Sequence, residues 1–222
     1  MTTSRERTAL VVVDMQNDFC VGPVATARHG DPARLDTVTT NTALAVDAAR
    51  RRDMEVVFVR FLGDTHYQGP SWRRRDLVLG KQAKCLEGSW GAEFHKVSPG
   101  PDELVVTKRA CFDAFLGDGF EEHLCRRGIG HLVFAGLYTD VCVDSTARTA
   151  FQKGFHVTVL TDCTASLHLP DLEIQRFMAL VYGARLMTHE QSDAWSQAPK
   201  GEHTWPNPVP MLIPTQANGT RA

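Results

Sequence analysis

Short apolar runs alternate along the chain with stretches whose apolar residues recur at helical spacing. Residues 8–14, TALVVVD, form a nearly continuous β-branched run, typical of a parallel strand buried on both faces. In residues 32–52, by contrast, Leu35, Val38 and Ala45 fall on one helical face. By the same criteria the expected strands are 8–14, 55–60, 102–108, 131–137, 156–162 and 184–190. The expected helices are 32–52, 117–127, 141–153 and 170–182.

Strands that alternate with helices favour one α/β architecture. Gly128 and Gly154 stand just past two expected helix ends, where a left-handed residue commonly ends a helix. Each strand–helix–strand unit implies a right-handed crossover between parallel strands. We therefore predict one domain over residues 1–222 with a core at 8–190: a doubly wound, Rossmann-like, mostly parallel six-stranded sheet with helices on both faces.

Two segments depart from this alternation. Residues 61–101 contain no strand pattern and are rich in Gly, Pro, Trp and charge, so this insertion is expected to be functional or to carry short helices. Residues 191–222 are expected to form no helix and to be an arm that is either packed or disordered. Five prolines lie in this arm: Pro199, Pro206, Pro208, Pro210 and Pro214.

Composition limits the partners of the protein. A net charge of −2 gives no field that would attract nucleic acid or an anionic membrane. No run approaches the ~20 apolar residues of a membrane span, and the first residues do not resemble a signal peptide. Six cysteines without CxxC spacing indicate reduced thiols, not a disulfide framework or a zinc site. We expect a cytoplasmic protein with no cofactor, no nucleic-acid partner and no membrane partner.

Three reactive residues stand at the carboxyl ends of expected strands, where open parallel sheets bind ligands. Asp14 ends the first strand, Lys108 ends the third, and Cys142 follows the fourth at the start of a helix. Taken singly, they could be a turn-capping carboxylate, a solvated lysine and an inert core thiol. Because all three are expected to converge, a shared chemical role is favoured.

The three side chains suit nucleophilic catalysis without histidine or metal. A helix start and a nearby ammonium are expected to lower the pKa of the Cys142 thiol. The Asp14 carboxylate can accept the thiol proton and return it to a leaving amine. Backbone N–H groups near Cys142 can bind the oxyanion of a tetrahedral intermediate.

Three segments resemble the isochorismatase-like hydrolases over residues 8–190. ALVVVDMQNDF (9–19) resembles their opening strand, with Asp14 as the acid/base, and VVTKRACFDAF (105–115) resembles their lysine segment, with Lys108 as the catalytic lysine. The segment 134–166, which contains TDVCV, resembles their nucleophile segment and maps the nucleophile to Cys142. The resemblance also implies a cis peptide at Leu137–Tyr138 and an oxyanion hole made by the backbone N–H groups of Tyr138 and Cys142.

The resemblance implies a cysteine hydrolase that cleaves a C–N bond of a small amide, ureide or lactam through a covalent thioester. Members that hydrolyse the vinyl ether of isochorismate typically lack the cysteine, so Cys142 favours the amidohydrolase branch. Three alternatives stay open: a vinyl ether hydrolase, a metal-dependent nicotinamidase, and a catalytically silent binding protein of the same fold. The nicotinamidase would use Asp64 and His66, with His95 farther along, but GDTHYQGP also reads as a polar turn.

The resemblance further suggests a homo-oligomer, either a dimer or a tetramer, and residues that bind the substrate. These are Phe19, Gln16, Trp90 and Tyr138, although Gln16 could equally make an ordinary buried hydrogen bond. The run 73–75, three arginines, is either a contact for a substrate carboxylate or a solvated face. Cys111 and Cys163 lie outside the nucleophile segment and are expected to be dispensable.

Overall fold

The computed structural model describes residues 7–22, 24–25 and 32–199, so the proline-rich part of the arm lies outside the described residues. The strands are β1 (Arg7–Val13), β2 (Glu55–Leu62), β3 (Leu104–Arg109), β4 (Ile129–Leu137), β5 (His156–Ala165) and β6 (Arg185–Met187). The α-helices are α1 (Asn17–Cys20), α3 (Pro32–Arg51), α4 (Pro70–Leu79), α5 (Phe120–Arg126), α6 (Asp144–Gln152), α7 (Asp171–Tyr182) and α8 (Ser192–Trp195). Short 3₁₀ turns occur at Trp90–Ala92, Ala114–Leu116 and His189–Gln191, and a π-helical turn occupies Thr139–Val143.

The six strands form one parallel sheet in the order β3-β2-β1-β4-β5-β6. From β1 the chain moves outward through β2 to β3, and it then returns to β4 on the other side of β1. The strand order therefore reverses between β1 and β4, and such a switch point opens a crevice at the carboxyl ends of these two strands. The predicted doubly wound sheet is confirmed.

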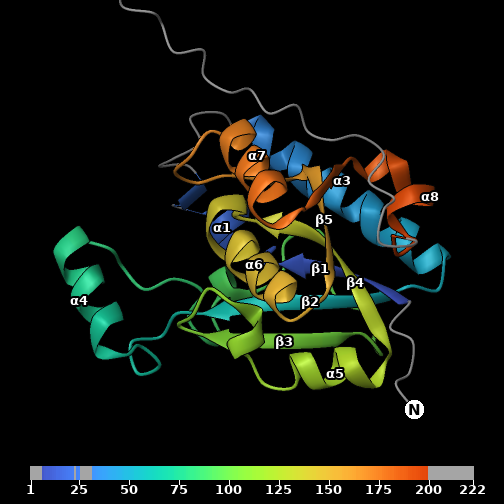
Figure 1. The fold of residues 1–222 in the computed structure, drawn as a ribbon. Coiled ribbons are helices and arrows are strands. Elements are labelled where there is room, and N and C mark those ends of the chain that lie inside the picture. Colours follow the sequence, from blue (N-terminus) through green and yellow to red (C-terminus); the bar gives the residue numbers. More distant parts are fainter. Residues whose placement is uncertain (1–6, 23, 26–31, 200–222) are drawn as a thin grey trace, which may run out of the picture.

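Helices pack on both faces of the sheet, as predicted (Figure 1). One face carries α5, α6 and α7, whose buried residues include Leu124, Ala147 and Met178. The other face carries α3, α1 and α8, with Leu35 of α3 and Trp195 of α8 in its core. Strands β1 and β4 are apolar on both sides because they are covered on both sides.

The insertion and the arm differ in part from the prediction. Strand β2 reaches Leu62, so the insertion begins after that residue, and it carries α4 as the pattern allowed. Helix α4 projects from the body of the protein and has no buried residue (Figure 1). The prediction that residues 191–222 form no helix was wrong at α8, where the fully buried Trp195 stabilises a single helical turn.

Two further observations concern the sequence-based expectations on membranes and thiols. Within the described part of the chain, no helix combines the length and the hydropathy that crossing a bilayer requires. All six cysteines are free thiols, four of which are buried.

Candidate active site

The three reactive residues meet at the switch point of the sheet. The Lys108 Nζ atom donates a hydrogen bond to Asp14 Oδ2 at 2.7 Å, and both side chains are buried. Asp14 and Lys108 lie close enough to the Cys142 thiol to shift the pKa of this thiol through charge and hydrogen bonding. Asp14 and Cys142 line the same cavity. The structure thus brings together a carboxylate just after β1, an ammonium near the end of β3 and a thiol in the turn after β4.

Asp14 is held at the end of β1 by backbone contacts. Its φ of 50° lies in the left-handed region, and its N–H donates to the carbonyl of Val59 on β2 at 2.9 Å. The neighbouring strand approaches closely here, because a Cβ on Gly136 of β4 would lie 2.0 Å from the carbonyl oxygen of Val13. Only glycine at position 136 allows β4 to pack this tightly beside the residue that precedes Asp14.

The two oxygens of Asp14 have different environments. Oδ2 accepts from Lys108, whereas Oδ1 is buried and makes no hydrogen bond of ordinary geometry. Burial raises the pKa of this carboxyl, and Lys108 and the Cys142 thiol oppose that rise. A buried carboxylate with an open oxygen beside a thiol is placed to accept its proton.

Lys108 is fixed by the loop that follows its strand. Its Nζ also donates to the carbonyl of Phe112 at 3.0 Å and lies 5.8 Å from the ring centroid of Phe61. Burial lowers the pKa of this ammonium, but Asp14 and then Cys142 raise it, and the net direction is upward. Lys108 therefore stays charged beside Asp14 at neutral pH.

Cys142 lies in the π-helical turn between β4 and α6. Helix α6 begins only at Asp144, three residues later than the sequence pattern indicated. The carbonyl of Cys142 accepts a hydrogen bond from the Thr146 hydroxyl at 2.8 Å, which ties the turn to the first turn of α6. π-turns inserted before a helix are frequent at functional sites.

The expected activation of the Cys142 thiol by a lowered pKa was wrong. Burial, followed by the charge of Asp14, raises the pKa of this thiol, and the opposing effect of Lys108 is smaller. The resting side chain is therefore a neutral thiol. A proton acceptor is needed when the sulfur attacks, and Asp14 is the adjacent carboxylate.

The peptide bond Leu137–Tyr138 is cis, as the family resemblance implied. The Tyr138 hydroxyl donates to the carbonyl of Phe19 at 2.7 Å, and the two rings pack edge to face with centroids 6.0 Å apart. This contact joins the segment before Cys142 to helix α1. That the backbone N–H groups of Tyr138 and Cys142 form an oxyanion hole remains a prediction.

The cavity above the thiol has a volume of about 150 Å³, which suits a small molecule. Phe19 and Tyr138, both predicted to bind substrate, line it. Three more aromatic side chains, which the sequence pattern did not indicate, complete the wall of the cavity: Phe61, Trp72 and Phe112. Trp72 lies on α4, so the insertion does contribute to the cavity.

Two other predicted substrate-binding residues do not line the cavity. Gln16 is fully buried, where its side chain donates to the carbonyls of Phe61 and Ala92 and accepts from the Phe61 N–H. These bonds satisfy the amide, so the hydrogen-bonding interpretation holds. Trp90 is 58% exposed, and its carbonyl accepts from the side chain of Asn17. The sequence pattern showed a Trp in the insertion but did not show which way it faces.

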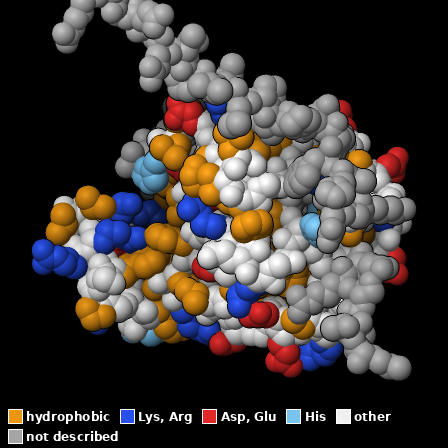
Figure 2. All heavy atoms as spheres, viewed as in Figure 1, with side chains coloured by type: hydrophobic (Ala, Val, Ile, Leu, Met, Phe, Trp, Pro, Cys, Tyr) orange, Lys and Arg blue, Asp and Glu red, His pale blue; other side chains and the backbone are white. Residues whose placement is uncertain are grey.

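Cationic side chains line the cavity on the side of the insertion. Arg75 stacks over the Trp72 ring at 4.0 Å and bonds to Asp76, whereas Arg73 and Arg74 do not line the cavity. The cavity is also lined by Lys81 and Lys84 of the insertion, and by His168 of the loop after β5. Figure 2 shows Lys and Arg side chains gathered on the projecting part that α4 occupies in Figure 1.

The loop after β5 is fixed to the nucleophile turn by Asp140. The two carboxylate oxygens of Asp140 accept from the backbone N–H groups of Leu167, His168 and Leu169 at 2.7, 2.7 and 2.9 Å. Leu167 and His168 both line the cavity. Because Asp140 stands two residues before Cys142, it sets the distance between this loop and the thiol.

The residues considered for a nicotinamidase-type metal site do not converge. Asp64 accepts the backbone N–H of Glu87, His66 packs against Tyr67, and His95 shares a hydrogen bond with Asn17. In residues 7–22, 24–25 and 32–199, the one group of three ligand side chains close enough to bind a metal is Asp162, Cys163 and His189. The Asp64, His66 and His95 set therefore does not fit a metal at the cavity.

The chain is similar to known proteins in both sequence and fold. Residues 8–191 match the family model described as Isochorismatase domain. The chain is 32% identical over 174 residues to a ureidoacrylate amidohydrolase RutB of Variovorax paradoxus, covering 72% of this chain and 69% of that relative.

Solved structures show the same fold. N-carbamoylsarcosine amidase from Thermoplasma acidophilum is 25% identical with a TM-score of 0.71, covering 88% of this chain and 99% of that one. An isochorismatase family protein from Desulfovibrio vulgaris is 26% identical with a TM-score of 0.70, covering 85% of this chain and 97% of that one.

Proposed function

The chain belongs to the isochorismatase family, and on that premise we propose that it is an amidohydrolase that cleaves a non-peptide C–N bond through Cys142. One observation carries the proposal: the Cys142 thiol and the Asp14 carboxylate line one small cavity, and the buried Lys108 ammonium donates a hydrogen bond to that carboxylate. A vinyl ether hydrolase would leave Cys142 without a role. The named relatives, a ureidoacrylate amidohydrolase and an N-carbamoylsarcosine amidase, support the same reaction class.

In the proposed first half-reaction, Asp14 Oδ1 takes the Cys142 thiol proton while the sulfur attacks the substrate carbonyl carbon. A tetrahedral intermediate forms, with its oxyanion facing the backbone N–H groups of Tyr138 and Cys142. When the C–N bond breaks, the nitrogen takes the proton from Asp14 and leaves as an amine or ammonia. The carbonyl carbon remains on Cys142 as a thioester.

In the second half-reaction, water attacks the thioester and Asp14 accepts its proton. The C–S bond then breaks, Asp14 returns the proton to the sulfur, and the carboxylic or carbamic acid leaves. Lys108 keeps its charge throughout, orients Asp14 through the 2.7 Å bond and limits the rise in the pKa of that carboxyl. Each group thus returns to its starting protonation state.

For the substrate, we propose a small ureide or amide that carries a carboxylate. Lys81 and Lys84 line the side of the cavity formed by the insertion, next to the Arg75–Asp76 ion pair, and His168 lines it from the loop after β5. Asp14, the other acidic residue of the lining, is paired with Lys108. Cationic side chains at a cavity mouth raise the local concentration of anionic substrates. The aromatic wall of Phe19, Phe61, Trp72 and Phe112 suits a flat amide or ureido group.

The experiment that tests the proposal measures ammonia release from primary amides, ureido acids and the methyl esters of these acids by the purified protein, and it follows the ring opening of lactams by mass spectrometry. We expect turnover of ureido acids or carboxylate-bearing amides, a kcat/KM at least about tenfold lower for the methyl esters, and no turnover by Cys142→Ala. Intact-mass spectrometry during turnover is expected to show an adduct of the acyl group on the wild-type protein only. An active Cys142→Ala protein would contradict the mechanism, and equal rates for acids and esters would contradict the substrate class.

A further inference from the structure

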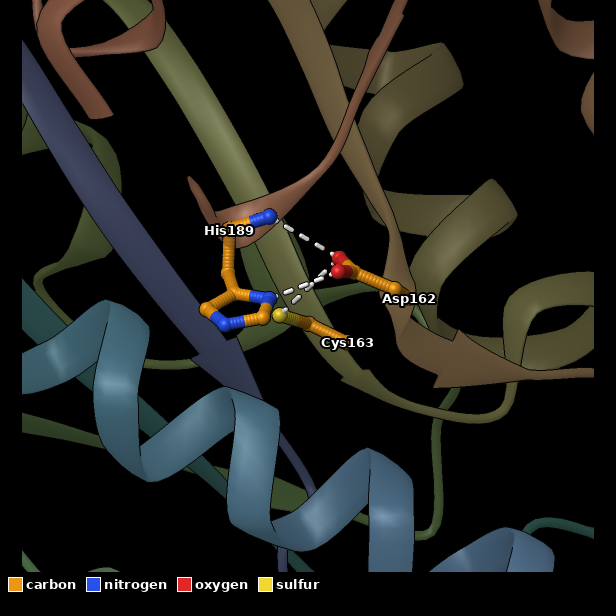
Figure 3. Close-up of side chains that lie close together, drawn as sticks. All are labelled: Asp162, Cys163 and His189. Carbon is orange, nitrogen blue, oxygen red and sulfur yellow. Dashed lines mark hydrogen bonds and ion pairs between the residues drawn. The ribbon is translucent and has the colours of Figure 1, made fainter. Parts of the chain in front are cut away.

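A second group of reactive side chains lies beyond the residues that line the catalytic cavity. Asp162 and Cys163 come from β5, and His189 comes from the 3₁₀ turn after β6 (Figure 3). One carboxylate oxygen, the Cys163 sulfur and one imidazole nitrogen all lie within 4.8 Å of one another. His189 Nδ1 is 2.6 Å from Asp162 Oδ2, and Cys163 Sγ is 3.6 Å from Asp162 Oδ1.

An irregularity in β5 explains why two adjacent residues reach the same point. Side chains alternate between the faces of a regular strand, so Asp162 and Cys163 would otherwise point in opposite directions. Between the pairs Phe134–Val159 and Gly136–Thr164, β4 advances two residues while β5 advances five. The extra residues of β5 break the alternation, and such bulges commonly redirect side chains at functional sites.

The backbone around the group is fixed from three elements. Asn41 and Thr42 of α3 donate to the carbonyls of Asp162 and Cys163 at 3.0 and 3.2 Å. The His189 N–H donates to Asp162 Oδ1 at 2.9 Å, and its carbonyl accepts from the Trp195 indole at 3.2 Å. The side chains of Asp162, Cys163 and His189 are therefore attached to a backbone that is already fixed in the structure.

We propose that Asp162, Cys163 and His189 bind one Zn²⁺ ion, with a solvent molecule as the fourth ligand. A thiolate, an imidazole and a carboxylate together are a donor set that zinc accepts and that Mg²⁺ and Ca²⁺ do not favour. The thiolate and the carboxylate balance the two positive charges of the ion. Cys163 is buried, but the side chains of Asp162 and His189 are 27% and 16% exposed, so solvent reaches the site.

The ion would occupy the position of the proton between His189 Nδ1 and Asp162 Oδ2. With zinc–ligand bonds near 2.1 Å, the ligand atoms of a tetrahedral site lie roughly 3.4 Å apart. The 2.6 Å contact must therefore open by about 0.8 Å, which small rotations of the carboxylate and imidazole provide. Asp162 Oδ1 keeps its bond to the His189 N–H, and the imidazole proton moves to Nε2.

A nucleophilic role for Cys163 fits less well. Burial, followed by the Asp162 carboxylate, raises the pKa of this thiol, and neither neighbour is placed as a free base. A metal ion reverses this balance because its charge stabilises the thiolate, whose proton is released to solvent on binding. The bound ion would join β5 to the segment that contains α8.

The test uses the full-length protein after treatment with a chelator and removal of the chelator. Titration with Co²⁺ is expected to show one saturable site with thiolate-to-cobalt charge-transfer absorption, and Zn²⁺ is expected to displace the cobalt. Cys163→Ser keeps a small polar side chain beside Asp162 and is expected to remove the charge-transfer absorption. His189→Gln keeps a hydrogen-bond donor to Asp162 and is expected to weaken Zn²⁺ binding by more than about tenfold.

Two control variants separate this site from other thiols. Cys111→Ser and Cys142→Ser are expected to keep the spectrum and the stoichiometry, and circular dichroism checks that every variant is folded. Absence of saturable binding would overturn the proposal. So would a charge-transfer band that persists in Cys163→Ser or disappears in Cys142→Ser, since the cobalt would then be bound elsewhere.

Discussion

At the scale of single residues, the chemistry depends on a buried ion pair beside a thiol. Asp14 and Lys108 have almost no exposed side-chain surface, and desolvation of both charges is offset by their 2.7 Å contact. The placement of Asp14, Lys108 and Cys142 could be predicted because each lies at or just after the carboxyl end of a recognisable strand. The raised pKa of Cys142 could not, since it comes from burial by strands and loops far apart in sequence.

We predict that Lys108→Met removes most of the activity and lowers the free energy of unfolding by about 3–5 kcal/mol at neutral pH, because Asp14 is left buried without its partner. Without the ammonium of Lys108, the pKa of Asp14 would rise further. In this variant the Asp14 carboxyl therefore takes up its proton at a higher pH in the folded state than in the unfolded state. The stability loss is therefore present at neutral pH and shrinks as the pH falls through that raised pKa. Urea unfolding at several pH values measures it.

Lys153→Met is the matched control for this prediction. Lys153 also forms a 2.7 Å ion pair, with Glu121, but it is about one third exposed. This variant is expected to change the free energy of unfolding by less than about 1 kcal/mol. Equal effects of the two substitutions would contradict the importance of the buried pair.

A second prediction concerns alkylation of the free enzyme by iodoacetamide. The raised pKa of Cys142 and its small exposed fraction predict slow labelling at neutral pH, slower than that of the exposed Cys125. The lowered pKa expected from Lys108 and the helix start would give the reverse order of labelling, because that expectation did not include burial. Labelling of Cys142 should accelerate as the pH rises toward its pKa, since the thiolate is the nucleophile. Peptide mass spectrometry at pH 7 and 9 measures both rates; preferential labelling of Cys142 at pH 7 would contradict the neutral resting thiol.

At the scale of elements, strands and long helices were predictable because their apolar periodicity is strong. The expected strand 131–137 became β4 (Ile129–Leu137), and the expected helix 170–182 became α7 (Asp171–Tyr182). The aromatic wall was not predictable, because α4 buries no side chain of its own and leaves no amphipathic pattern. Its role appears only when Trp72 and Arg75 are placed over the cavity.

Gly136 gives an element-scale prediction. A Cβ at this position would meet the Val13 backbone at 2.0 Å, and its φ of 110° disfavours any side chain. Gly136→Ala is therefore expected to separate β4 from β1, displace Asp14 from Cys142, and lower the free energy of unfolding by at least about 2 kcal/mol. Gly69→Ala is the control, since a Cβ there has no neighbour within 4 Å and its φ of −69° is ordinary. A Gly136→Ala protein with full activity would contradict the close packing.

Asp140 is expected to act as a positioning residue. Asp140→Asn replaces one carboxylate oxygen by an NH₂ group, which donates and cannot accept, so at least one of the backbone N–H groups of Leu167, His168 and Leu169 loses its acceptor. Because this loop lines the cavity and does not touch Asp14 or Lys108, KM is expected to rise by roughly tenfold with a smaller change in kcat. Steady-state kinetics measures both. Asp118→Asn, on an almost fully exposed side chain, is the control, and a fall in kcat alone would contradict the positioning role.

At the scale of the whole molecule, the sheet order places the catalytic residues. The alternation of elements predicted a doubly wound parallel sheet with ligand binding at its carboxyl edge, but the strand order, and therefore the switch point between β1 and β4, comes from the structure. The packing of α8 on the face of the sheet that carries α3 could not be anticipated. A four-residue helix has no measurable periodicity, and the prolines that follow it indicated an irregular arm.

Trp195 tests whether stability and catalysis are separable in this molecule. Its ring is fully buried in the core beside α3, and its indole bonds to the His189 carbonyl, but it does not line the catalytic cavity. Trp195→Ala is therefore expected to lower the free energy of unfolding by about 3–5 kcal/mol while kcat at 25 °C stays within about twofold. Trp195→Phe keeps most of the ring and loses the hydrogen bond, so a loss of only about 1–2 kcal/mol is expected.

Trp90→Ala is the matched control, because Trp90 is more than half exposed. This substitution is expected to lower the free energy of unfolding by less than about 1 kcal/mol. Chemical denaturation and steady-state kinetics on the same preparations separate the two effects. If kcat fell in Trp195→Ala under conditions where the variant is fully folded, the α3 face of the sheet would be coupled to the thiol on the other side of β1. The catalytic geometry would then depend on packing across the entire sheet, and the strand ends alone would not be sufficient to hold Asp14, Lys108 and Cys142 in contact.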